Sequence, residues 1–215
     1  MDLKTFTTIK YVIVGDSSVG KSSLFLHFTK GQFRENEEPT VGADTASKDM
    51  LLDKKGYKIQ ISGVSGQEIF RQMNCGYYKN SAVALLVYEI DKRESFEHIT
   101  RWMDDIKKNA PKNVLMILVG NKCDLEDNRE VSQEEGKEFA EKNEMKFFET
   151  SAKTGQNVEE VFKQGVEIIA KRLNENVSNL EDDYNYGIKI EKNENNFGKN
   201  LKKEKENSIC ERCFN

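Results

Sequence analysis

Short apolar runs alternate with amphipathic stretches along the chain as far as Leu173. Residues 82–90 (AVALLVYEI) and 113–120 (NVLMILVG) are almost wholly apolar, which is typical of strands buried on both faces. Residues 93–110 carry apolar side chains at helical spacing instead, and Pro111 ends that predicted helix. Strands that alternate with helices predict a mostly parallel α/β sheet, whose ligands bind at the carboxyl ends of the strands.

The same reasoning predicts the other elements. We expect strands at 9–15 and 145–150, helices at 20–29, 132–143 and 157–173, and a short helix ending at Tyr78. A hairpin is predicted from strands 46–53 and 57–61, with its turn around Gly56.

Three segments follow from this pattern. Residues 1–8 form a short N-terminal extension, and residues 9–173 form one domain. Residues 174–215 are rich in Asn, Lys and Glu and poor in aliphatic side chains, so we predict a disordered tail.

Composition narrows the possible functions. The 215-residue chain has a net charge of −4, which argues against a general nucleic-acid binder. Its apolar runs are too short to span a bilayer, and no signal peptide is evident, so we expect a cytoplasmic and monomeric protein. Cys75 and Cys123 suggest no disulfide framework.

A phosphate-binding motif follows the first predicted strand. Residues 15–22 (GDSSVGKS) fit G-x-x-x-x-G-K-[ST] and open the first predicted helix. The backbone N–H groups and the helix N-terminus attract phosphates, Lys21 reaches the terminal phosphates, and the Ser22 hydroxyl ligates Mg²⁺. The motif indicates a nucleotide site without specifying the base.

Two further motifs select the base. NKCD (121–124) and ETSAK (149–153) each follow a predicted strand. Asp124 can accept hydrogen bonds from the ring N–H and the exocyclic amine of guanine, a pair of donors that adenine lacks. Lys122 can cover the base with its alkyl chain, and the Ala152 N–H can meet the guanine carbonyl. Asp124 therefore disfavours an ATP-dependent kinase or ATPase.

The order of these motifs, together with PTVG (39–42) and GQE (66–68), resembles the Ras superfamily of small GTPases. The phrases YYKNSAVALLVYEI, RESFEHITRW, LVGNKCDL and ETSAKTGQNVEEVF are most similar to the Rab family, from about Ile9 to Leu173. The resemblance implies a six-stranded, mostly parallel sheet with five flanking helices. It also implies binding of GTP, GDP and Mg²⁺, hydrolysis of GTP, and a role as a membrane-trafficking switch.

The resemblance also assigns site residues. Gln67 would orient the attacking water, Lys21 would stabilise the phosphates, and Thr40 would join Ser22 on Mg²⁺ when the γ-phosphate is present. Gly66 would donate its N–H to that phosphate. The predicted nucleotide-binding residues are Ser17, Ser18, Val19, Gly20, Lys21, Ser22, Ser23, Phe33, Thr40, Gly66, Asn121, Lys122, Asp124, Ser151, Ala152 and Lys153.

One departure from the family pattern lies beside these residues. Small GTPases of this branch usually have Trp-Asp-Thr-Ala-Gly-Gln-Glu where this chain has Ser-Gly-Val-Ser-Gly-Gln-Glu (62–68). Gly63 replaces an aspartate that holds the water ligands of Mg²⁺, and losing such a partner typically weakens metal binding about 10- to 100-fold. Nucleotide binding should survive, which leaves two alternatives: a GTPase that still turns over, or a nucleotide-binding scaffold that barely cycles. Asp16 and Glu68 are nearby acids, but the sequence does not show that either substitutes.

A second departure concerns effector recognition. Rab proteins usually have an aromatic residue at the position of Thr45 and tryptophan at that of Ser62, beside an aromatic equivalent to Tyr77 or Tyr78. Two members of this surface cluster are therefore replaced. Relaxed constraint in a diverged copy and a different set of effectors both explain the change, and we favour the first.

The tail ends in SICERCFN, with Cys210 and Cys213 separated by two residues. This is neither an adjacent cysteine pair nor a C-a-a-X box. Free thiols and half of a zinc site are alternatives, but no second cysteine or histidine pair lies nearby. By resemblance we favour prenylation and attachment to the cytoplasmic face of intracellular membranes, with a cytosolic pool. The expected partners are effectors, an exchange factor, a GTPase-activating protein and a prenyl-lipid chaperone.

Overall fold

A computed structural model of the chain describes residues 5–35, 40, 42–67, 74–175 and 187–192. Its strands are β1 (Thr5–Val14), β2 (Ala43–Leu52), β3 (Lys55–Val64), β4 (Val83–Glu89), β5 (Leu115–Asn121), β6 (Lys146–Glu149) and β7 (Ile188–Lys192). Its α-helices are α1 (Lys21–Lys30), α2 (Cys75–Tyr78), α3 (Arg93–Glu97), α4 (Ile99–Asn109), α5 (Gln133–Lys142) and α6 (Val158–Glu175), and Glu126–Asn128 form a 3₁₀ turn.

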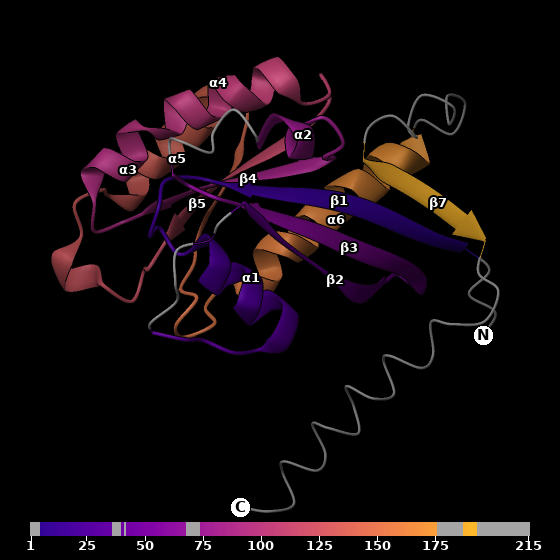
Figure 1. Cartoon of the computed structure of the whole chain (residues 1–215), viewed down its shortest axis with the longest axis horizontal. Helices are drawn as coiled ribbons and strands as arrows, with labels where there is room; N and C mark the ends of the chain where they lie inside the picture. The colour runs from indigo at the N-terminus through magenta and orange to yellow at the C-terminus, as the bar shows by residue number, and fades with distance from the viewer. Residues whose placement is uncertain (1–4, 36–39, 41, 68–73, 176–186, 193–215) are drawn as a thin grey trace, which may run out of the picture.

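The strands form one mixed sheet in the order β2-β3-β1-β4-β5-β6, with β7 paired to β1 (Figure 1). The pairs β1–β3, β1–β4, β4–β5 and β5–β6 are parallel, whereas β2–β3 and β1–β7 are antiparallel. The predicted α/β fold with a mostly parallel sheet is therefore confirmed.

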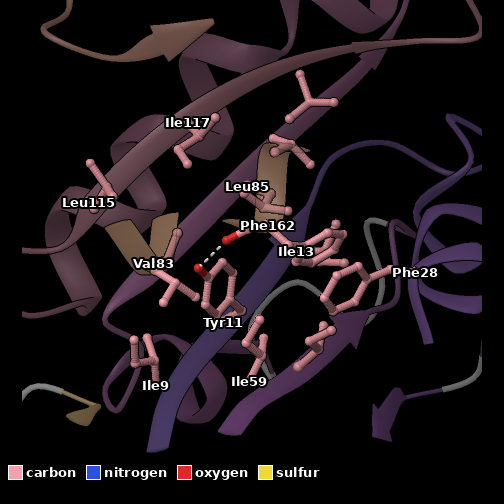
Figure 2. Packing of buried hydrophobic residues seen from close by; sticks show 14 of the residues in the cluster. Ile9, Tyr11, Ile13, Phe28, Ile59, Val83, Leu85, Leu115, Ile117 and Phe162 are labelled. Carbon is pink, nitrogen blue, oxygen red and sulfur yellow. Dashed lines mark hydrogen bonds between the residues drawn. The ribbon is translucent and has the colours of Figure 1, made fainter. Parts of the chain in front are cut away.

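Helices cover both faces of the sheet. On one face, α1 and α6 pack over side chains that include Tyr11, Ile59 and Val83, and the Tyr11 hydroxyl donates a 2.8 Å hydrogen bond to the Phe162 carbonyl (Figure 2). The opposite face is covered by α2, α3, α4 and α5. Every residue of β4 is buried, as its continuous apolar run predicts. Within the described ranges, no helix is long and apolar enough to cross a bilayer.

The β2–β3 hairpin differs from the prediction in its turn. The strands are longer than expected, and the turn is the pair Asp53–Lys54, whose φ angles are 48° and 64°. Two central residues with positive φ match the tight turn that suits twisted strands. Gly56 lies inside β3 instead, paired with Leu51.

The helix predicted at 93–110 is divided at His98 into α3 and α4. The His98 carbonyl accepts from the N–H of Arg101 as well as that of Trp102, so the chain tightens to a 3₁₀ turn there. For this reason the described residues contain six α-helices rather than the expected five.

The sheet has a seventh strand that was not predicted. Residues 188–192 form β7 and pair with Thr5–Ile9 of β1, so the prediction of a disordered tail is wrong for these five residues. Likewise β1 begins at Thr5, inside the predicted N-terminal extension. Short isolated segments lack the long periodic pattern that identifies other strands, and tertiary pairing decides their structure.

Candidate functional site

The phosphate-binding motif lies at the carboxyl end of β1, as predicted, and leads into α1. Ser18 and Gly20 have φ angles of 68° and 89°, which curl the loop around its backbone N–H groups. A Cβ atom at Gly20 would lie 2.3 Å from the Asn121 amide nitrogen, so glycine is required for this close approach. The phosphate loop is thereby packed directly against a residue of the predicted base site.

Lys21 is the buried cation of this loop. Its ammonium donates a 2.6 Å hydrogen bond to the Asp16 carbonyl, and the residue is buried. Burial lowers the pKa of Lys21 to about 8, although the Asp16 charge acts in the opposite direction. A buried ammonium with little compensating charge is suited to an anionic ligand such as a phosphate.

Two hydroxyl groups approach one another beside Lys21. Ser22 Oγ, from α1, and Thr40 Oγ1, from the segment before β2, are 2.8 Å apart. Adjacent ligands of an octahedral Mg²⁺ ion at 2.0–2.1 Å would be about 3 Å apart, so this pair fits two neighbouring positions on such an ion.

The base side is a connected hydrogen-bond network. The buried Asn121 side chain donates to the Val19 carbonyl at 2.9 Å, and its oxygen accepts from Thr150 Oγ1 at 3.1 Å and from Ala152 N at 3.4 Å. Ser151 Oγ donates to Asp124 Oδ1 at 2.5 Å. The network joins the phosphate loop, the end of β5 and the segment after β6, which holds Asp124 in a defined position.

Lys122 has an acidic partner that the sequence analysis missed. Its ammonium bonds to the carboxylate of Glu89, which is 5% exposed at the end of β4. Lys122 itself has a φ of 64°. The only sequence signal for this partner is the position of Glu89, an acidic residue near the end of an otherwise apolar run.

A cavity of about 410 Å³ brings these groups together. It is lined by every predicted nucleotide-binding residue except Val19 and Ser151, together with Gln67. Val19 and Ser151 are buried, and their hydrogen bonds hold the lining residues instead. Lining residues that were not predicted are Arg34, Glu35, Ser65 and Leu125. A larger cavity, about 650 Å³, is lined by other residues, among them Lys112, Arg172 and Ile188.

The altered segment forms the end of β3 and the following loop. Gly63 pairs with Ile13 of β1 and with Asp44 of β2, and a Cβ atom added there would meet nothing within 4 Å. Gly63 is buried, yet space for the first atom of a side chain is open there. Glu68 lies outside the described residues.

The next glycine is tightly constrained. A Cβ atom on Gly66 would lie 2.4 Å from Asp16 C and 2.5 Å from Ser17 N. The loop is held by Ser65 N, which donates to the Gly42 carbonyl at 2.9 Å, and by Asn74, which donates to the Ser65 carbonyl at 3.1 Å. Asn74 is buried and was not predicted, and nothing in the sequence pattern identified it.

Asp16 is already engaged elsewhere. One carboxylate oxygen lies 2.6 Å from His98 Nδ1, and the other accepts a 2.8 Å hydrogen bond from Trp102 Nε1. Both partners lie on or beside α4, so this carboxylate is anchored to a helix rather than directed to the Ser22–Thr40 pair.

In this α/β fold, one cavity brings together the phosphate-binding motif and the predicted guanine-binding residues. A sequence model of the Ras family matches residues 10–171. The chain is also 45% identical to the Ras-related protein Rab-2B of Dictyostelium discoideum over 176 residues, which is 82% of this chain and 87% of that protein. The chain belongs to the Ras family, and it is a Rab-like small GTPase, a class of enzyme that hydrolyses GTP to GDP and phosphate.

Proposed function

We propose that the protein is a membrane-trafficking switch that retains guanine-nucleotide binding but binds Mg²⁺ weakly and therefore hydrolyses GTP slowly. One observation supports the second half of this proposal above all. The open space at Gly63 lies where the family has a carboxylate that holds the water ligands of Mg²⁺.

The proposed roles begin with the phosphates and the metal. Lys21 and the backbone N–H groups of residues 17–23 bind phosphates, and Ser22 and Thr40 hold Mg²⁺. The metal, when bound, neutralises phosphate charge. The 2.8 Å separation of the two hydroxyls supports their assignment.

Hydrolysis depends on two neighbours at the end of β3. Gly66 donates its N–H to the γ-phosphate, and Gln67 orients the attacking water. Both residues line the same cavity as Lys21, which supports their assignment to one site. Asp124, Lys122, Ala152 and Lys153 recognise guanine, and Phe33 contacts the base from its side.

The surface that responds to nucleotide comprises residues 33–45 and 63–78. Thr45 and Ser62 are direct cross-strand partners, and Tyr77 is 40% exposed, whereas Tyr78 is buried. Thr45 and Ser62 stand where the family has aromatic residues. We therefore expect weak binding to effectors that recognise the aromatic cluster.

Membrane attachment is assigned to Cys210 and Cys213, which lie outside the described residues. Two lipid groups would give stable anchoring where one would not. We propose prenylation of these thiols, a location on the cytoplasmic face of intracellular membranes, and recycling by a prenyl-lipid chaperone. An exchange factor and a GTPase-activating protein would set the rates of the cycle.

A second candidate function is a guanine-nucleotide-binding scaffold that barely cycles. Gly63, together with Val64 and Ser65, favours it because all three depart from the family pattern beside Gly66 and Gln67. The two candidate functions predict different rates of GTP hydrolysis but the same binding of guanine nucleotide.

Single-turnover GTP hydrolysis at several Mg²⁺ concentrations tests the proposal and separates the candidates. Wild type, Gly63→Asp and Gly63→Asn are compared, because asparagine matches the volume of aspartate without its charge. We expect Gly63→Asp alone to accelerate hydrolysis at low Mg²⁺. Equal rates for wild type and Gly63→Asp would refute the assigned role of Gly63. Absence of hydrolysis in wild type at saturating Mg²⁺, with GTP bound, would favour the scaffold.

A further inference from the structure

The tail segment Gly187–Lys192 is docked on the sheet. β7 pairs with β1 in five residue pairs, from Ile9–Ile188 to Thr5–Lys192 (Figure 1). The partner strand β4 contacts β1 only at Tyr11–Val14, so β7 covers an edge that would otherwise present unpaired N–H and C=O groups.

The backbone of Gly187 packs closely against residues 80–82. Gly187 has a φ of 76°, and a Cβ atom there would lie 2.4 Å from the Asn80 carbonyl oxygen and 2.5 Å from Ala82 N. The Gly187 carbonyl accepts a 2.8 Å hydrogen bond from Lys10 N, while the Lys10 carbonyl accepts from Ala82 N at 2.9 Å. Only glycine combines this backbone angle with this close approach.

Ile188 fixes the side-chain register of the strand. It is 8% exposed and belongs to the core on the α1 and α6 face, and it also lines the 650 Å³ cavity. The next residue, Lys189, is exposed. A short strand with one buried side chain is an arrangement that can open locally without unfolding the domain.

Docking changes the length of chain that is free to reach the predicted lipid-bearing cysteines. From Lys192 to Cys210 the chain advances 18 residues, whereas from Glu175, the end of α6, it advances 35. Fully extended, these segments span about 60 Å and about 120 Å. The antiparallel pairing places Lys192 beside Thr5, at the end of β1 opposite the phosphate loop.

We propose that Gly187–Lys192 is a latch that halves the tether between the nucleotide-binding domain and Cys210, and that its release lengthens the tether. Latched, the domain is held close to its attachment point with the nucleotide face directed away from it. Released, the same domain reaches partners farther from that point. The link to membrane reach rests on the proposed lipidation, whereas the latch itself does not.

Hydrogen exchange on the full chain bound to GDP tests the latch. In wild type, amides of the hydrogen-bonded pairs between β1 and β7 should be protected. Gly187→Ala should speed their exchange by about tenfold or more and leave the α1 amides unchanged. Gly31→Ala is the matched control, because Gly31 has a φ of 64° and open space around a Cβ atom. Fast exchange of β7 in wild type, or equal protection in Gly187→Ala, would overturn the latch.

The tether length is measured separately. Nitroxide labels are placed on Cys213 and on Lys58→Cys of exposed Lys58, in a background of Cys75→Ser, Cys123→Ser and Cys210→Ser. Release by Gly187→Ala, or by Ile188→Asn as a second variant, should broaden the distance distribution and lengthen it by roughly 10 Å. An unchanged distribution in both variants would contradict the proposal. Neither readout needs lipid or hydrolysis, so a failure of the proposed function leaves this result interpretable.

Discussion

The base side of the site and the second switch (residues 63–78) are built in different ways. On the base side, one buried side chain, Asn121, ties together the phosphate loop and the segment after β6 through three hydrogen bonds. In the described part of the second switch, the loop after β3 is held by backbone contacts at Ser65, which donates to the Gly42 carbonyl and accepts from Asn74, and Gly63 leaves space where a Cβ atom would lie. We therefore expect recognition of the base to depend on the Asn121 network more than on the altered segment. Changes in the second switch should therefore slow hydrolysis without lowering the affinity that the base side provides.

Breaking the base network should have the largest effect. Asn121→Ala removes three hydrogen bonds and leaves buried partners unsatisfied, which costs about 3–4 kcal/mol in nucleotide affinity. We expect GDP release to become about 100- to 1,000-fold faster in stopped-flow measurements with a fluorescent GDP analogue. Asn109→Ala is the control, because the Asn109 side chain bonds to Asp105 O within α4, away from the cavity. A change in GDP release smaller than about threefold in Asn121→Ala would mean that nucleotide affinity does not depend on this network.

Displacing the second switch should affect chemistry more than binding. In Gly66→Ala the new Cβ would collide with the Asp16–Ser17 backbone, so the loop must move away from the phosphates. We expect single-turnover hydrolysis to slow by about 100-fold, with GDP affinity changed far less. Gly76→Ala has open space and serves as the matched control. Equal losses of affinity and rate would erase the distinction between the two regions.

Protonation of Lys21 in the phosphate loop should be linked both to folding and to nucleotide binding. The pKa of Lys21 is lowered to about 8 in the folded chain, so between pH 8 and 10.5 the folded state holds fewer protons than the unfolded state. The unfolding free energy of nucleotide-free protein should therefore rise with pH in this window, relative to Lys21→Met.

Phosphate binding restores the charge on Lys21, so GDP affinity should fall as pH rises above 8. Calorimetry at pH 8.5 in buffers of different ionisation heat should detect uptake of about half a proton or more. The Lys21→Met variant should lose that uptake. Uptake that survives in this variant would assign the coupling to another group.

Removal of the Ser65 hydroxyl should have the smallest effect on the hydrolysis rate. Among the described residues, its hydroxyl accepts a long, 3.4 Å hydrogen bond from Gln67 N. Ser65→Ala should cost about 0.5 kcal/mol or less, which is about twofold in the hydrolysis rate. An effect above about tenfold would show that this hydroxyl, rather than the missing carboxylate at Gly63, limits the switch.

The sequence predicted what depends on long periodic patterns and on glycine-bearing motifs. The fully buried strand β4, the capped helix α5 and the cavity lined by Lys21, Asp124 and Gln67 were all found in this way. The helix predicted at 132–143 is confirmed as α5, and the Ser132 hydroxyl caps its first turn by accepting from Glu135 N.

What could not be predicted depends on contacts between distant segments. β7 acquires its structure by pairing with β1, and Glu89 and Asn74 acquire their roles from Lys122 and Ser65. The sequence around β7 and Asn74 has no periodicity that distinguishes it from ordinary polar positions, whereas Glu89 stands out only as an acidic residue in an apolar run. The turn at Asp53–Lys54 was missed because Gly56 carried the stronger local signal.

The most direct test of the central claim is the Mg²⁺ dependence of GDP retention in wild type, Gly63→Asp and Gly63→Asn. GDP release is followed as free Mg²⁺ is lowered with a chelator. Since a Cβ atom added at position 63 would meet nothing within 4 Å, we expect both variants to fold and bind GDP. We predict that Gly63→Asp lowers the Mg²⁺ concentration for half-maximal retention by about 10- to 100-fold and that Gly63→Asn does not. Identical Mg²⁺ curves for wild type and Gly63→Asp would contradict the account.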